Sequence, residues 1–196
     1  AERIRAYVAG GGHLVVSYLS GVADEHARVY PGGYPGAFRD LLGVRVEEFH
    51  PLDPATEAPL SDGTAGRLWS ETVRLTGATT VTAYATGALD GCPAVTRHSY
   101  GGGVAWYVST RLADDAYARL LTRAARAAGA TPTCPAAPPG VEAIRRRTAT
   151  TSWLFLLNHT DREQVVPAAG VDLLTDRTVT NAVVLAPGGC AVLRER

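Results

Sequence analysis

The chain has 196 residues, enough for one large domain or two smaller domains with buried cores. Its 46% hydrophobic and 19% charged residues are typical of a soluble globular protein and exclude intrinsic disorder. The 19 basic and 19 acidic residues cancel, so charge favours neither nucleic acid nor an anionic membrane as a partner, and no apolar run reaches the roughly 20 residues that span a bilayer.

The chain opens on a helical pattern, with Ile4, Tyr7 and Val8 at helical spacing and no N-cap residue before them. Since the sequence also contains no Met, we expect it to be a piece of a longer protein. The glycines at 10–12 end this helix, and a buried strand is predicted for residues 13–18.

The segment 20–43 combines glycines, two tyrosines, a phenylalanine and a group of ionisable side chains. Its second half predicts a short helix after Pro35 that stops at Gly43. Such a passage is typical either of a ligand loop or of a surface that contacts another protein.

Strands dominate the next part of the chain. Residues 44–49 predict a strand, and the prolines from Pro51 onward predict a loop up to Gly66. Four alternating strands follow, with the glycines at 101–103 as a hairpin turn, at residues 67–75, 79–86, 93–100 and 103–110. We expect Trp69 and Trp106 in these apolar strands to lie in the core.

A long amphipathic helix is predicted for residues 114–129. Asp114 or Asp115 would cap it, and Gly129 would end it. The side chains expected on its buried face recur at helical spacing and are Leu120, Leu121, Ala124 and Ala128.

Residues 131–140 contain four prolines and mark a domain boundary. We place the first domain at residues 1–132, a proline-rich linker at 133–140 and a second domain at 141–196. The second domain has six short strand patterns and no helix, which predicts a small antiparallel sandwich that packs on a neighbour.

No catalytic nucleophile is convincing. Pro93 follows Cys92 and has no N–H to stabilise an oxyanion, Cys190 has no helix after it, and Cys134 lies in the linker. Ser20 lacks the glycine two positions earlier that a nucleophile elbow needs.

Acid–base and metal chemistry are equally poorly supported. Asp24, Glu25 and His26 are adjacent and therefore point apart, whereas paired catalytic carboxylates must face each other across a cleft. The spacing of the cysteines offers neither a disulfide framework nor a metal site. Arg145–Arg147 favours an exposed or interface strand face over a nucleic-acid site. The residues alone indicate two soluble domains without an evident active site or cofactor.

Three ordered blocks resemble the C-terminal half of the bacterial β-galactosidases of glycoside hydrolase family 42. They run from "VVSYLSGVADEHARVYPGGYPGAF" to "EEFHPL", from "GCPAVTRHSY" to "STRL", and from "GVEAIRRR" to "GGCAVLRE", and they cover nearly the whole chain. The resemblance implies a flavodoxin-like domain, similar to class I glutamine amidotransferases, followed by a small all-β domain.

The resemblance also implies a role. In that family a (β/α)8 barrel carries two catalytic glutamates, and this chain has no counterpart of it, so no catalytic residue carries over. We expect a cytoplasmic, non-catalytic fragment that supports homotrimer formation and the barrel of a retaining enzyme acting on terminal β-D-galactosides. The contact candidates share an irregular loop and are Asp24, Glu25, His26, Tyr30, Tyr34 and Phe38.

Two alternatives stay open. The first is an amidotransferase-like hydrolase that uses Ser20 or a cysteine. The second is a carbohydrate-binding role for the C-terminal domain, whose only aromatic side chains, Trp153 and Phe155, lie in a strand that we expect to be buried.

Overall fold

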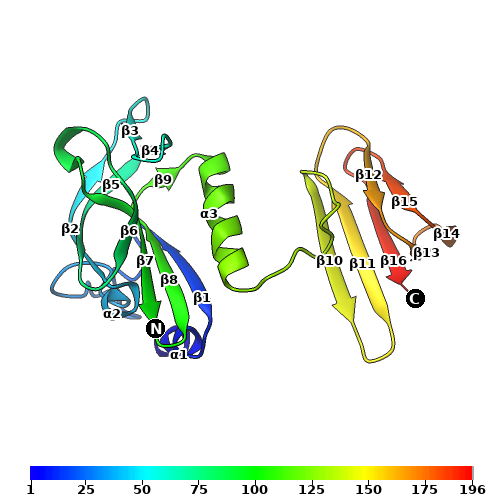
Figure 1. Cartoon of the computed structure of the whole chain (residues 1–196), viewed down its shortest axis with the longest axis horizontal. Coiled ribbons are helices and arrows are strands. Elements are labelled where there is room, and N and C mark those ends of the chain that lie inside the picture. Colours follow the sequence, from blue (N-terminus) through cyan, green and yellow to red (C-terminus); the bar gives the residue numbers. More distant parts are fainter. Residues whose placement is uncertain (196) are drawn as a thin grey trace. The chain divides into compact units, whose positions relative to one another are not determined.

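The computed structural model describes residues 1–195, and Arg196 at the end of the expected β domain lies outside the described residues. The chain forms two compact units, residues 1–130 and the residues from Thr131 onward. Each unit has its own sheets and its own core, and each is described by itself (Figure 1).

The first unit combines three α-helices with nine strands. The helices are α1 (Glu2–Ala9), α2 (Arg39–Leu42) and α3 (Asp114–Ala127), and a short 3-10 turn spans Gly87–Leu89. The strands are β1 (His13–Ser17), β2 (Val44–Pro51), β3 (Glu57–Pro59), β4 (Ala65–Arg67), β5 (Trp69–Leu75), β6 (Thr79–Ala83), β7 (Pro93–Tyr100), β8 (Gly103–Val108) and β9 (Arg111–Leu112).

A four-stranded mixed sheet organises this unit, with the strand order β1-β8-β7-β6. β1 and β8 run parallel, and the other two pairs are antiparallel. The predicted hairpin turn at 101–103 is confirmed between β7 and β8. Gly103 is required there, because a Cβ atom would lie 2.1 Å from the carbonyl oxygen of Gly12 and 2.2 Å from that of Val8.

Both faces of the sheet are covered, which is why β8 is buried along its whole length. Val104, Trp106 and Val108 pack on one face with Leu120 and Ala124 of α3, and Figure 1 shows α3 lying along that face. On the other face a second core joins the sheet to α1, α2 and the β2–β5 pair; its members include Val8, Leu41, Leu42, Val44, Val46, Val73, Ala105 and Tyr107.

Helix α3 confirms the predicted position but not all of its details. Ala113 is the N-cap and no side chain caps the helix, so the prediction that Asp114 or Asp115 is the cap is wrong; both lie in the first turn. Leu121 is 51% exposed and Ala128 is exposed, because the buried stripe runs through Ala116, Leu120 and Ala124 instead. Gly129, at φ +70°, follows the helix as predicted.

We predicted a loop between Pro51 and Gly66, but this region contains strands. β3 pairs with β4, and β4 pairs with β9, in a three-stranded antiparallel sheet. These strands have two or three residues each, too few to show an alternating pattern in the sequence.

The second unit consists of antiparallel strands, as predicted. They are β10 (Val141–Arg147), β11 (Ser152–Asn158), β12 (Gln164–Pro167), β13 (Gly170–Asp172), β14 (Arg177–Val179), β15 (Ala182–Leu185) and β16 (Cys190–Glu195). One sheet has the order β10-β11-β16-β13-β14, and the other pairs β12 with β15. Leu154, Leu156 and Leu193 of the first sheet share a core with Val166 and Leu185 of the second.

Among residues 1–195, no helix combines the length and the apolar character that crossing a membrane requires.

Candidate self-association surface

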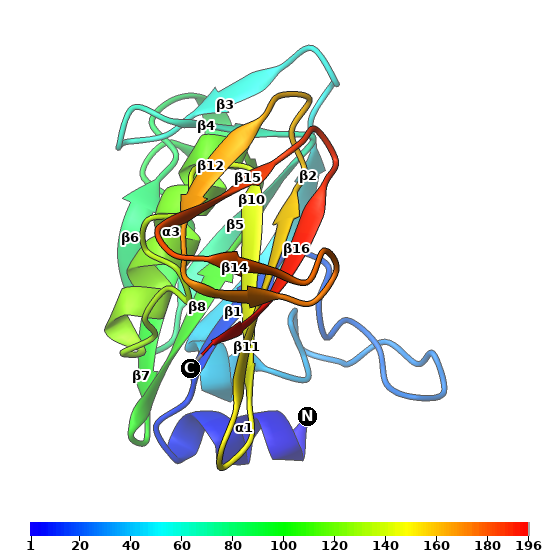
Figure 2. The same cartoon turned by 90° about the vertical axis from the view of Figure 1, so that its right-hand side faces the viewer.

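An irregular segment, residues 18–38, connects β1 to α2 and contains every predicted contact residue. We call this segment the arm. Leu19, in the left-handed region at φ 61°, turns the chain out of β1. Ala23 and Val29 then pair as an antiparallel bridge, and Tyr30 donates its N–H to the carbonyl of Val22. Figure 2 shows the arm in blue, projecting away from the sheet of its unit.

Asp24 holds the tip of the arm together. One carboxylate oxygen accepts the backbone N–H groups of His26 and Arg28, and the other accepts Nε of Arg28, each at 2.9 Å. These donors, first the N–H of Arg28, keep the pKa of Asp24 below its ordinary value. The ionisable cluster is therefore a turn that Asp24 stabilises.

The far end of the arm is anchored in the core of the first unit. Tyr34 exchanges two backbone hydrogen bonds with Val46, and its ring and that of Phe38 pack against the core around α2. Tyr30 is half-buried and lies over Gly36, where a Cβ atom would come 2.0 Å from the Cβ of Tyr30.

The six predicted contact residues therefore divide by exposure. Glu25 and His26 are exposed at the tip, while Asp24, Tyr30, Tyr34 and Phe38 are half-buried. Two exposed apolar side chains of the arm join them, Leu19 at 52% and Val29 at 57%.

A row of four half-buried aromatic rings lies beside the anchor of the arm. Tyr34 stacks on Phe49 at 4.6 Å between ring centroids, Phe49 contacts Trp69 at 5.2 Å, and Trp69 stacks on Tyr18 at 6.0 Å. We call Tyr18, Trp69, Phe49 and Tyr34 the aromatic row. Partly exposed aromatic side chains of this kind are enriched where proteins bind one another.

A buried carboxyl group supports the row from below. Glu71 is fully buried on β5; Trp69 donates its indole N–H to one carboxyl oxygen at 3.0 Å, and Tyr107 donates its hydroxyl to the other at 2.6 Å. Burial raises the pKa of Glu71 to about 7, although both hydrogen bonds oppose the rise. Burial also raises the pKa of the Tyr107 hydroxyl, and the neighbouring carboxylate adds to this effect.

The aromatic row could not be predicted from the sequence. Its members come from the end of β1, the arm, β2 and β5, so only the fold brings them together. The expectation that Trp106 lies in the core is confirmed, at 1% exposure, but Trp69 is half-buried and belongs to this surface.

The nucleophile candidates remain without catalytic partners in the part of the chain that the structure describes. Ser20 is followed by a turn, and the next helix begins only at Arg39. Cys92, Cys134 and Cys190 are free thiols, and no hydrogen bond joins any of them to a histidine within residues 1–195. Over the same residues, no three His, Cys, Asp or Glu side chains cluster as metal ligands.

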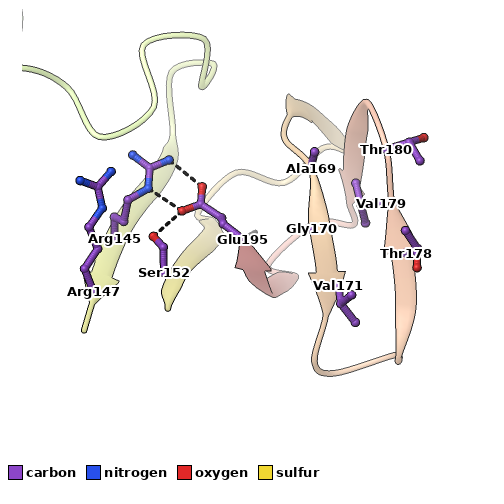
Figure 3. A pocket seen from close by; sticks show the side chains of 10 residues that line it. All are labelled: Arg145, Arg147, Ser152, Ala169, Gly170, Val171, Thr178, Val179, Thr180 and Glu195. Atoms are coloured by element: carbon purple, nitrogen blue, oxygen red, sulfur yellow. Dashed lines mark hydrogen bonds and ion pairs between the residues drawn. The ribbon is translucent and has the colours of Figure 1, made fainter. Parts of the chain in front are cut away.

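The second unit contains an open cavity of about 820 Å³ at the end of the sheet that carries Arg145 and Glu195. Figure 3 shows these two side chains joined by two hydrogen bonds of 2.8 Å, with Ser152 donating to Glu195 at 2.6 Å. Arg145 also donates to the carbonyl of Thr133, so this cluster satisfies itself. None of the lining residues is aromatic, so the cavity offers no ring on which a sugar could stack.

We expected the two aromatic side chains of the second unit to be buried, but neither of them is. On β11 the buried positions are Leu154, Leu156 and Asn158, so the alternating Trp153 and Phe155 lie half-buried on the opposite face of the sheet. Because residues 153–157 are all apolar, the sequence shows no alternation that would distinguish the two faces of this strand.

These features define a class of protein: a mixed α/β unit followed by an antiparallel β unit, with no assembled catalytic set among residues 1–195. Similar proteins agree with that class. Residues 1–130 match the family described as the β-galactosidase trimerisation domain, and residues 140–195 match the β-galactosidase C-terminal domain. The chain belongs to the β-galactosidases of glycoside hydrolase family 42.

Curated relatives match over the whole chain. A β-galactosidase of Arthrobacter sp is 44% identical over 100% of this chain and 28% of its own length, and LacZ of Heyndrickxia coagulans is 40% identical over 99% and 30%. The chain thus spans about 30% of the length of these relatives.

Solved structures confirm the architecture. The β-galactosidase from Bacillus circulans sp. alkalophilus is 28% identical and superposes with a TM-score of 0.88, over 100% of this chain and 30% of that one. A catalytic mutant of Gan42B, a family 42 β-galactosidase from G. stearothermophilus, is 25% identical with a TM-score of 0.86, over 100% of this chain and 29% of that one. The matched domains are the trimerisation and C-terminal domains, and residues 1–195 contain no catalytic barrel.

Proposed function

We propose that this chain is a non-catalytic part of a β-galactosidase and that it assembles with two further copies into a homotrimer. The observation that carries the proposal is the match of residues 1–130 to a trimerisation domain. The aromatic row and the arm supply a surface of the composition that such an assembly needs.

A ring of three copies requires two different surfaces on each copy, because a threefold contact is head-to-tail. The arm projects from its unit and exposes Leu19 and Val29. We therefore assign it to the surface that each copy would insert into the next copy. The aromatic row suits the surface that receives, because its stacked rings are already held in place by Glu71 and by each other.

The parent protein, on this proposal, hydrolyses terminal β-D-galactosides with retention of configuration in the cytoplasm, and a barrel outside this chain performs the chemistry. Relatives named β-galactosidase and the free state of all three cysteines support this reading. The chain itself would serve the barrel by oligomerisation and support, and would need no cofactor.

We further infer that the first unit is a flavodoxin-like domain of the class I glutamine amidotransferase type. The parallel β1–β8 pair and the helices on both faces of its sheet support this assignment. The domain limits that we propose, residues 1–132 and 141–196 with a linker at 133–140, are compatible with the matched ranges 1–130 and 140–195.

Light scattering during size-exclusion chromatography tests self-association. We expect a mass about three times the 20.6 kDa of one chain. Val29→Glu places a charge on the arm and should lower this mass. Val165→Glu is the matched control, because Val165 is equally exposed, at 55%, but lies in the second unit. A monomeric unsubstituted chain, or equal effects of both substitutions, would overturn the proposal.

A further inference from the structure

We propose that four arginines beside Trp106 form a binding surface for an acidic segment of another protein. The surface consists of Arg97 on β7 and Arg119, Arg123 and Arg126 on α3, and we call it the arginine surface. It lies on the face of the sheet that α3 covers, whereas the aromatic row rests on Glu71 and the opposite core.

Two guanidinium groups converge on one ring. The Cζ atom of Arg97 lies 5.9 Å from the centroid of Trp106, and that of Arg123 lies 5.3 Å from it. The ring attracts both cations through its quadrupole, but it carries no net charge and leaves both positive charges unneutralised. A bound anion would neutralise them.

Carboxylate partners on this surface are few. Within residues 1–195, Arg119 is the only one of the four arginines that forms an ion pair, with Asp115 at 2.7 Å. Asp62 lines the same hollow as Arg119 but already accepts hydrogen bonds from Thr64 and Thr82. Four guanidinium groups against two carboxylates leave an excess of positive charge.

The shape of the surface favours an extended ligand over a small ion. A hollow of about 260 Å³ between α3 and strands β6 and β7 is walled by Val81, Val95 and Leu120. A second hollow of about 430 Å³ lies along Thr122 and Arg126 of α3, and Arg119 and Arg123 line both. From Arg119 to Arg126 the helix rises by about 10 Å, more than one carboxylate or phosphate group spans.

The chemistry of the partner follows from these two observations. Carboxylates accept two parallel hydrogen bonds from one guanidinium group, so a segment with several acidic residues can engage the arginines in sequence. The apolar wall of the first hollow accommodates an aliphatic side chain between them. A segment that alternates acidic and aliphatic residues has both properties.

Fluorescence anisotropy of a labelled synthetic peptide of alternating glutamate and leucine, titrated with the whole chain, tests the proposal. We expect saturable binding that weakens as salt is added. The double substitution Arg123→Ala and Arg126→Ala should weaken binding about tenfold or more. Both side chains are exposed on α3, where alanine favours the helix, so the fold should persist. Arg97→Ala should weaken binding on its own.

The matched control is Arg162→Ala with Arg177→Ala, two exposed arginines of the second unit, which removes the same net charge. An equal loss in both double variants would overturn the proposal, as would absence of binding. Complete displacement of the peptide by inorganic phosphate would mean a small-anion site and would also overturn it. Light scattering separates this surface from self-association: the two double variants should keep the mass of the unsubstituted chain, and a lower mass for the Arg123 and Arg126 variant would identify a contact between copies instead.

Discussion

The buried carboxyl group of Glu71 should make the stability of the first unit depend on pH near neutrality. In the folded chain its pKa is raised to about 7, whereas in the unfolded chain it returns to its ordinary value of 4.5. The difference of about 2.5 pH units corresponds to about 3 kcal/mol in the free energy of unfolding.

The sign of this pH dependence follows from which state, folded or unfolded, binds the proton. Between pH 4.5 and 7 the folded state binds a proton that the unfolded state has lost, so the stabilisation is complete below pH 4.5 and declines as the pH rises to 7. Asp40, whose pKa the Arg5 side chain lowers, acts in the opposite direction and at lower pH. Glu71→Gln keeps the shape of the side chain without an ionisable proton and should remove the decline.

Urea unfolding followed by tryptophan fluorescence measures this effect. Trp153→Phe in every protein removes the one tryptophan of the second unit and leaves Trp69 and Trp106, so the signal reports only the first unit. The stability of the Glu71→Gln variant relative to its parent should rise by about 3 kcal/mol between pH 4.5 and 7.5.

A matched substitution, Glu48→Gln, changes an exposed carboxyl of the same unit and should show no such rise. A difference curve for Glu71→Gln that stays flat between pH 4.5 and 7.5, or that rises as the pH falls, would refute the reasoning from burial.

Three further outcomes test other parts of the molecule. Asn158→Ala removes the donor to three carbonyls, those of Arg162, Leu185 and Ala186, and should cost the second unit about 2–4 kcal/mol in urea unfolding. Gly103→Ala places a Cβ atom against two backbone carbonyls and should destabilise the first unit by about 3 kcal/mol. Thermal unfolding followed by circular dichroism should then show a lower midpoint temperature for this unit. The chain alone should leave a chromogenic β-galactoside intact, and turnover above the buffer blank would contradict its non-catalytic role.

Local signals in the sequence predicted much of the secondary structure. Gly43, at φ 61°, ends α2 where an L-residue would be strained, and Gly129 follows α3 in the same conformation. The strands β5 to β8 were predictable from their apolar content and from the glycine-containing turns between them, since each of these strands has five or more residues.

Other features had no local signal. The strands β3, β4 and β9 are too short to alternate visibly, and they form because β4 pairs on both sides. The rotation of α3 that exposes Leu121 depends on where Trp106 and Val108 lie beneath it. Trp153 and Phe155 lie on one face of β11, and the buried Leu154 and Leu156 lie on the other. Which face is buried depends on the packing of the core and not on the strand's own sequence.

The sequence placed the candidate contact residues in one irregular segment, and their contact with another copy stays a prediction. The sequence could not distinguish the exposed Glu25 from Tyr34, which packs against the core. Tyrosine and phenylalanine suit a core and an interface equally well. Only the fold showed that Tyr34 continues into a row with Phe49, Trp69 and Tyr18.

The aromatic row lies at the end of the sheet where α/β proteins commonly bind ligands. Open α/β sheets bind ligands outside the carboxyl ends of their parallel strands. In this unit Tyr18 follows the end of β1, and Tyr107 near the end of β8 donates to Glu71. We infer that Glu71, Tyr107 and Trp69 close this place, because the carboxyl group that could address a substrate already accepts hydrogen bonds from the other two side chains. The half-buried rings of the aromatic row lie beside this carboxyl group, and their composition suits contact with protein.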